Sequence, residues 1–308
     1  MSVVRQCLED YLAARRALGF KVERHECLLT AFVRFLESTG ATAVTTELAV
    51  SWATDTKESV NWRADRLDAA RQFARYLQAI DPNTEVPPAG LLPRASRRAT
   101  PHIYTDTEVA ALLEATRTLR TQIARATYPT LISLLFVTGM RPGEAIRLDR
   151  TDIDWEHGLL TVRDTKFGKF REVALHATTV AALASYSRQR DALIPHPSSP
   201  SFFVSQVGTR LIHNGVDRTY RSLVRAAALD GTPSRRLRLH DFRHTFAVRT
   251  VLDWYRAGLD VGPRLPLLST YLGHVDPIST YWYLSATPEL LSLAAQRLQR
   301  TLEGGDPS

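Results

Sequence analysis

Four short segments of this sequence place reactive polar side chains beside turn residues. The first is TGMRPGE at residues 138–144, where Arg141 stands close to a glycine and directly before a proline. A guanidinium held on a short, stiff turn is suited to bind an anion with two parallel hydrogen bonds. The same arginine can instead pair with Glu144, three residues later, at the start of a helix. The sequence leaves both interpretations open.

The second segment is TKFGKF at residues 165–170, which contains Lys166, Gly168 and Lys169. The glycine permits a tight turn, so we expect this segment to form the tip of a β-hairpin. A lysine at such a tip can enter the groove of a ligand. For an isolated hairpin, a solvated turn lysine is the commoner case.

The third segment is HDFRH at residues 240–244. Helical spacing puts His240 and Arg243 on one face, so that a proton-transfer group lies next to a phosphate clamp. His244, four residues after His240, also fits the paired histidines of a zinc site. Asp241 stands where that motif has a glutamate, and the sequence indicates no third zinc ligand. We therefore expect no metal and a structural role for His244.

The fourth segment is LGHVDPISTYWY at residues 272–283. Gly273 is expected to end a helix and to leave His274 on the following turn. Thr280 and Tyr283 are three residues apart, so a short helix would present both on one side. Any single tyrosine in this segment would ordinarily be a core or surface residue.

Together the four segments supply the groups that attack of a tyrosine on a phosphodiester requires. Two arginines neutralise the non-bridging oxygens of the phosphate. Histidine and lysine can remove the phenol proton and protonate the leaving 5′-oxygen. This chemistry needs no metal or nucleotide, and no cofactor is expected. The six candidate catalytic residues are Arg141, Lys166, His240, Arg243, His274 and Tyr283.

Five motifs in this order resemble the catalytic domain of the tyrosine recombinases, the phage integrase and Xer family. They span residues 138–283 and read TGMRPGE, TKFGKFREVAL, HDFRHTFA, LGHVD and STYWY. The resemblance implies that Arg141 is the first catalytic arginine. It implies that Lys166 is the general acid for the 5′-oxygen, with Lys169 as its competitor.

The later motifs imply the remaining roles. By the same resemblance, His240 and Arg243 form the H-x-x-R pair, and His274 supports a phosphate oxygen. Tyr283 is then the nucleophile, and Tyr281 lies on a different helical face and is set aside. The sequence departs from the family pattern two residues after the nucleophile, where a serine replaces a frequent histidine.

The resemblance implies a site-specific recombinase that cuts and rejoins double-stranded DNA by transesterification through a 3′-phosphotyrosine bond. Four protomers would hold two DNA sites together and exchange strands in two steps through a Holliday junction. A C-terminal helix at residues 288–302 would dock on a neighbouring protomer; docking on its own domain is the alternative. A topoisomerase with the same chemistry and a non-catalytic DNA-binding protein of the same fold are the competing functions.

The elements that would position these residues divide into two domains. Residues 1–85 show three apolar helical faces, and residues 86–103 are rich in proline, glycine and arginine, which predicts a linker. Residues 104–308 form the second domain. The resemblance makes the first a SAM-like core-binding domain that contacts DNA and the second the catalytic domain. Around the third helical face lie four arginines, as a phosphate-facing stripe or a solvated face: Arg63, Arg66, Arg71 and Arg75.

In the second domain, the pattern predicts mainly helices with one small antiparallel β-sheet. Thr105 and Glu108 predict a capping box, and Pro129 is expected to start a helix that stops at Gly139. Residues 159–163 and 171–175 are expected to be the two strands of the hairpin. Further helices are expected at residues 178–190, 216–228, 240–252, 264–272 and 288–302.

Composition points in the same direction. A net charge of +7 and a pI of about 9.6 favour a polyanionic partner. The two cysteines, Cys7 and Cys27, supply neither a disulfide framework nor a metal cluster. The first residues include early acidic side chains and no long apolar stretch, so we expect a soluble, cytoplasmic protein.

Overall fold

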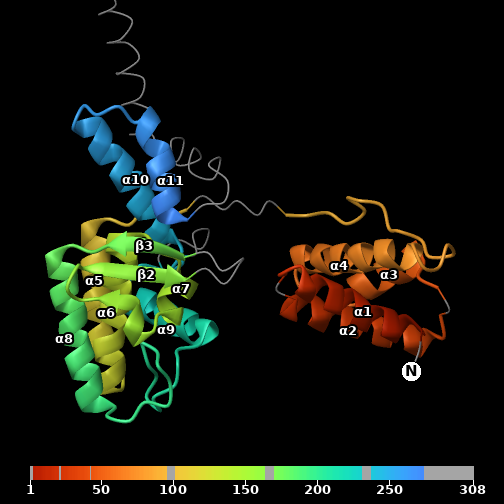
Figure 1. Cartoon of the computed structure of the whole chain (residues 1–308), viewed down its shortest axis with the longest axis horizontal. Coiled ribbons are helices and arrows are strands. Elements are labelled where there is room, and N and C mark those ends of the chain that lie inside the picture. The colour runs from red at the N-terminus through yellow and green to blue at the C-terminus, as the bar shows by residue number, and fades with distance from the viewer. Residues whose placement is uncertain are drawn as a thin grey trace, which may run out of the picture. The chain divides into compact units, whose positions relative to one another are not determined.

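The structure is a computed structural model of the chain, which divides into two compact units, Met1–Ala99 and Thr100–Ser308 (Figure 1). The division falls inside the proline- and arginine-rich segment 86–103. In the described residues, helices predominate and one antiparallel sheet is present, which confirms the expected fold class. The residues that the structure describes are 3–20, 22–41, 43–95, 101–163, 170–230 and 237–273.

The first unit is helical throughout its described residues. Its helices are α1 (Val3–Ala17), α2 (Glu23–Thr39), α3 (Thr46–Thr54) and α4 (Val60–Gln78). The three expected apolar faces belong to α1, α2 and α4, whereas α3 was not expected. Its nine residues are too few to show a clear period, and the helix is stabilised by tertiary packing, since Trp52 lies against Phe32 with ring centroids 4.8 Å apart.

Most of the four arginines near α4 bond within the first unit. Arg66 donates to the carbonyl of Trp52 at 2.5 Å, and its guanidinium lies 4.1 Å from the centre of the Trp52 ring. Arg63 donates to the carbonyl of Thr56. Arg71 donates to two proline carbonyls and pairs with Asp68. These three side chains therefore fix neighbouring loops, a use that neither a phosphate-facing stripe nor a solvated face anticipates.

In the second unit, one face of the sheet packs against helices (Figure 1). Helices α6 and α8 run side by side along one flank. Helices α10 and α11 share a separate apolar cluster at one end. Helix α10 also contacts α6. The elements are α5 (Asp106–Ala115), η1 (Thr116–Thr118), α6 (Gln122–Thr138), α7 (Pro142–Arg147), η2 (Arg150–Asp152), β1 (Ile153–Asp154), β2 (Leu159–Arg163), β3 (Phe170–Ala174), α8 (Ala177–Leu193), α9 (His213–Ala226), α10 (Asp241–Arg256), η3 (Gly262–Arg264) and α11 (Leu265–Leu272).

Local signals placed several helix ends correctly. Thr105 and Glu108 form the expected capping box at the start of α5. Gly139 ends α6 in the left-handed conformation, with φ of 61°. The expected start of α6 at Pro129 was wrong, because the helix begins at Gln122 and the proline lies inside it. Thr121 caps the true N-terminus by accepting from the Ala124 amide, and packing of the helix on the core outweighs the amide bond that proline removes.

The hairpin forms as expected, with one further strand. Strands β2 and β3 pair antiparallel, with Val162 opposite Arg171 and Leu160 opposite Val173. The two-residue strand β1 pairs with the other edge of β2, and its length is too short to be read from alternation. Val162 and Val173 are buried in the core of the unit together with Leu131, Leu135 and Phe242. Over the described residues, no helix is both long and apolar enough to span a membrane.

Candidate active site

Arg141 is the N-cap residue of α7, and Pro142 occupies the first turn of that helix, where proline is well tolerated. Its backbone amide donates to Oε2 of Glu144 at 2.8 Å, and its Nη1 donates to Oε1 of Glu144 at 2.7 Å. Its Nη2 donates to the carbonyl of Gly273 at 2.8 Å. About a third of the side chain, 35%, is exposed. Arg141 thus makes the ion pair with Glu144 and remains partly exposed.

The carboxylate of Glu144 is buried between two arginines. Arg171 on β3 donates Nη1 to Oε1 at 3.2 Å and Nη2 to Oε2 at 2.8 Å, opposite the bonds from Arg141. Burial alone would raise the pKa of Glu144. The hydrogen bonds and charge of Arg171, followed by those of Arg141, outweigh burial and lower the pKa to about 2. The carboxylate is therefore ionised throughout the neutral range.

Arg243 is fully enclosed on the first turn of α10. Its Nη1 donates to the carbonyl of Gly139 at 3.1 Å, and its Nη2 donates to the carbonyl of Leu272 at 2.5 Å. The carbonyl of Gly139 belongs to the turn that precedes Arg141. The carbonyl of Leu272 belongs to the residue before Gly273, whose own carbonyl Arg141 contacts. The two arginines, far apart in sequence, therefore converge on the C-terminal end of α11.

His240 is the N-cap residue of α10, three residues before Arg243. Desolvation of the imidazole, and then the charges of Arg243, Arg238 and Arg141, lower the pKa of His240 to about 4. The ring is therefore neutral near pH 7 and can accept a proton. The ring of His244 lies 5.0 Å from it in an edge-on arrangement, and His244 is half-buried, as a structural histidine would be.

Helix α10 is held at its start by buried polar contacts. Asp241 accepts from the backbone amide of Arg238 at 3.0 Å and from its Nη2 at 2.9 Å. The Thr245 hydroxyl accepts from the amide of Tyr104 and donates to the carbonyl of Asp241. Phe242 is fully buried against Tyr104, on the side of the helix that faces the core. These contacts fix the turn from which His240 and Arg243 extend.

The structure thus brings together three of the six candidate residues: Arg141, His240 and Arg243. Gly273 ends α11 in the left-handed conformation, with φ of 67°, as expected for the residue before His274. The other candidates lie outside the described residues: Lys166, its competitor Lys169, His274 and Tyr283, together with Tyr281 and the helix expected at 288–302. Among the residues that the structure describes, no group of three His, Cys, Asp or Glu side chains could hold a metal ion.

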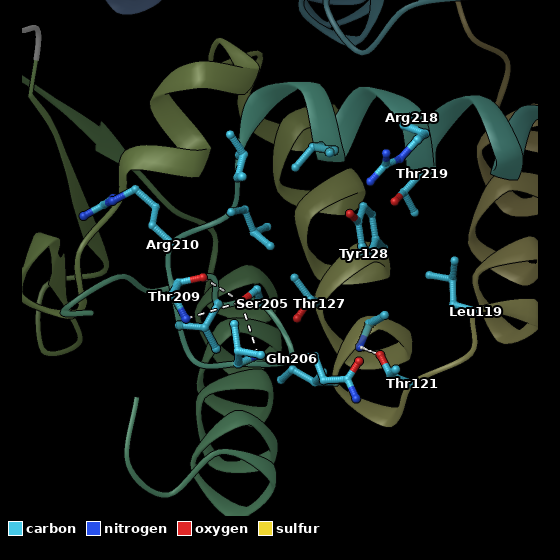
Figure 2. Close-up of a pocket in the computed structure, with 18 of the residues that line it drawn as sticks. Leu119, Thr121, Thr127, Tyr128, Ser205, Gln206, Thr209, Arg210, Arg218 and Thr219 are labelled. Carbon is cyan, nitrogen blue, oxygen red and sulfur yellow. Dashed lines mark hydrogen bonds between the residues drawn. The ribbon is translucent and has the colours of Figure 1, made fainter. Parts of the chain in front are cut away.

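A pocket of about 580 Å³ lies elsewhere on the second unit, between the first half of α6, the loop after α8 and α9 (Figure 2). At this pocket, Tyr128 of α6 lies beside Arg218 and Thr219 of α9, and Thr127 also lines it. None of the three converging candidates lines this pocket. The arginine cluster at the end of α11 is therefore a separate site.

Arg171 is the residue of this cluster that sequence reasoning missed. It shares a face of β3 with Val173, two residues later, and that face is buried. An arginine at a position where strand alternation predicts an apolar residue is the signal that could have identified it. The sequence gives no indication that its partner is Glu144, 27 residues earlier.

The phage integrase family matches residues 103–289 of this sequence, which include all six candidate residues. This chain belongs to the phage integrase family of tyrosine recombinases. A protein of Sinorhizobium fredii (strain NBRC 101917 / NGR234), provisionally named integrase/recombinase y4rB, is 43% identical to this family member over 98% of the chain and 99% of its own length. A second protein of that strain, y4rE, is 38% identical over 97% of the chain and 96% of its own length.

Solved structures of the family share the fold of this tyrosine recombinase. The Tn1549 transposon integrase in complex with transposon right end DNA superposes with a TM-score of 0.67 at 16% identity, covering 96% of this chain and 98% of that chain. XerH bound to the palindromic difH substrate superposes with a TM-score of 0.64 at 20% identity, covering 97% and 86%. At these identities the likeness establishes the fold alone.

Proposed function

We propose that this protein is a site-specific DNA recombinase that cleaves and rejoins DNA strands through a 3′-phosphotyrosine intermediate. The observation that carries the proposal is the convergence of Arg141 and Arg243 on the end of α11, with His240 one turn from Arg243. Two guanidinium groups and a neutral imidazole at one place suit a phosphodiester whose charge grows during attack. Membership of the recombinase family supports the same reaction.

In the proposed reaction, the phenol oxygen of Tyr283 attacks the scissile phosphorus and the bond to the 5′-oxygen breaks. His240 accepts the phenol proton, Lys166 gives a proton to the leaving 5′-oxygen, and His274 supports a non-bridging oxygen. The phosphate becomes a 3′-phosphotyrosine ester, so the energy of the diester is retained. Attack by the 5′-hydroxyl of a second strand reverses these steps and joins the strands.

Double-stranded DNA is the proposed partner of both units. The net charge of +7 agrees with a polyanionic ligand, and phosphate contacts would make binding fall with rising salt. In the proposed assembly, four protomers hold two DNA sites, and residues 288–302 of one protomer dock on its neighbour. The segment has leucines at helical spacing, which agrees with docking in an apolar groove.

The decisive experiment traps the covalent intermediate from cells. The tagged full-length chain is expressed in its host, recovered under denaturing conditions, and the DNA that remains attached is sequenced. The wild type is expected to retain DNA with one common end sequence. The 5′ end opposite the protein is expected to accept a phosphate from polynucleotide kinase without prior dephosphorylation, because a 3′ linkage leaves a free 5′-hydroxyl.

Two matched tyrosine variants give the control. Tyr281→Phe is expected to retain the adduct, while Tyr283→Phe is expected to lose it with unchanged affinity for duplex DNA. Adducts that persist in Tyr283→Phe would overturn the assignment of the nucleophile. Relaxation of supercoiled DNA that lacks a paired site would favour the topoisomerase alternative, and DNA binding without any adduct in the wild type would favour the non-catalytic one.

A further inference from the structure

Arg171 occupies an unusual place for a strand residue. It lies on the buried face of β3, opposite Val162, and only 14% of its side chain is exposed. A buried arginine carries a large desolvation cost unless its charge and its donors are all matched. The hydrogen bonds of Arg171 show how its charge and its donors are matched.

The guanidinium of Arg171 is bonded on two sides. Both terminal nitrogens donate to the two carboxylate oxygens of Glu144, at 3.2 and 2.8 Å, which is the two-pronged geometry specific to arginine. The third donor, Nε, binds the carbonyl of Tyr271 at 2.9 Å. Arg171 therefore joins strand β3 to the start of α7 and to the last turn of α11.

These contacts link segments that carry the candidate catalytic residues. Glu144 is shared with Arg141, and α11 ends at the carbonyls that receive Arg141 and Arg243. The end of α11 and Arg171 are also tightly packed, since a methyl group added at Gly273 would lie 2.8 Å from Nη1 of Arg171. Along the chain, Lys166 precedes Arg171 by five residues and His274 follows Tyr271 by three.

The net charge of the cluster that Arg171 completes affects how well the site can stabilise a phosphate. Arg141, Arg171 and Glu144 together carry one net positive charge. Without Arg171, the pair of Arg141 and Glu144 would be neutral, and the carboxylate would attract the guanidinium that has to meet the phosphate. Charges interact strongly in a buried site, so this difference acts directly on the stabilisation of a phosphate.

We propose that Arg171 is a positioning residue of the cleavage reaction: it compensates the charge of Glu144 and clamps β3 to the end of α11, so that the cluster with Arg141 keeps one net positive charge for the scissile phosphate. The inference rests on the proposed function, and it assigns a role to a residue whose Nε, Nη1 and Nη2 donate to Tyr271 and Glu144. Arginine is required for both parts of that role, because lysine supplies the charge without the fork of donors.

The test compares single-turnover cleavage of a nicked duplex that carries the trapped end sequence, at saturating DNA. Arg171→Met is expected to cleave about 10- to 100-fold more slowly than the wild type, with duplex affinity changed by less than about threefold. The cleavage rate of Arg171→Lys is expected to lie between the rates of Arg171→Met and the wild type. The matched control is Arg150→Met, because Arg150 also makes a two-pronged pair with a carboxylate, Asp191, away from the cluster. It is expected to cleave at the wild-type rate.

A second substitution separates charge compensation from simple support of the fold. The double variant Arg171→Met with Glu144→Gln restores one net positive charge, and it is expected to recover part of the rate lost in Arg171→Met. A purely structural role would leave the double variant as slow or slower. Cleavage by Arg171→Met at the rate of the Arg150→Met control, or no recovery in the double variant, would overturn the inference.

A readout independent of cleavage distinguishes this inference from the proposed function. The ionisation of Glu144 is followed by carbon NMR in the wild type and in Arg171→Met. The midpoint is expected to rise in the variant, because the carboxylate loses its strongest cationic partner. If the wild type forms no covalent adduct, the proposed function fails and the cleavage role fails with it. An unchanged midpoint would refute the charge compensation even where cleavage occurs.

Discussion

The hydroxyl groups of Tyr104 and Tyr220 share a hydrogen bond of 2.5 Å in the interior of the second unit. Tyr104 also stacks on Phe242, with ring centroids 4.5 Å apart, and its amide donates to Thr245 on α10. Burial, followed by the facing phenol, raises the pKa of Tyr104. The segment just before α5 is thereby fastened to the helix that carries His240 and Arg243.

This pair predicts a measurable coupling. Tyr220→Phe leaves the buried hydroxyl of Tyr104 without its partner and is expected to lower the free energy of unfolding by about 1–2 kcal/mol. The double variant Tyr104→Phe with Tyr220→Phe is expected to cost less than the sum of the two single changes. Urea unfolding of the full chain and of all three variants measures the coupling. Strict additivity would show that the bond contributes nothing.

The low pKa of Glu144 predicts that the folded protein loses stability in acid. Its pKa in the folded protein, about 2, lies below the ordinary glutamate value of 4.5, so the unfolded chain binds the proton more readily. Its contribution is therefore present above about pH 5 and is lost as the pH falls toward 2, with a magnitude of about 3 kcal/mol. Urea unfolding between pH 3 and pH 6 should show a shallower pH dependence in Glu144→Gln than in the wild type.

The control for this prediction is Glu114→Gln. Glu114 pairs with Arg117 at a separation of three residues, the same separation as between Glu144 and Arg141, but both side chains of this pair are exposed. Exposed pairs contribute little, so this variant is expected to keep the wild-type pH dependence. Equal pH dependence in Glu144→Gln and the wild type would contradict the prediction.

We predict that the imidazole of His240 is neutral in the DNA-free protein. Desolvation and then the positive charges of Arg243, Arg238 and Arg141 lower its pKa to about 4. Because the folded state binds this proton less readily than the unfolded chain, acid between about pH 6.5 and pH 4 disfavours folding through this group. Nitrogen NMR, with His240→Gln to assign the signal, should show a midpoint near 4 that rises when duplex DNA brings phosphate nearby. A midpoint near 6.5 in the free protein would contradict the lowered pKa of this exposed histidine.

Substitution by alanine is predicted to have opposite effects on stability at two glycines. Gly139 has a φ of 61°, and an added methyl group would lie 2.5 Å from the Phe246 ring, so Gly139→Ala is expected to destabilise the protein by about 2–4 kcal/mol. It also displaces the carbonyl that receives Arg243. Gly215 on α9 has open space around it, so Gly215→Ala is expected to be neutral or to stabilise by up to about 1 kcal/mol. Thermal unfolding of both variants checks the contrast.

Local signals in the sequence determined much of the framework. The capping box of Thr105 and Glu108, the helix ends at Gly139 and Gly273, and the hairpin each depend on residues within a few positions of one another. Such interactions are written in the sequence itself. Where long-range packing outweighs local preference, the expectation failed: Pro129 lies inside α6, and α3 and β1 are too short to show a period.

The sequence by itself determined the family and the identity of the six candidate catalytic residues, whose roles remain proposals. Only the tertiary structure decided how three of them meet. Arg243 binds a carbonyl 104 residues away, Arg141 binds one 132 residues away, and Arg171 shares Glu144 with Arg141. The physical reason is that a buried charge must find its partners wherever the fold brings them, and those partners leave no local pattern in the sequence.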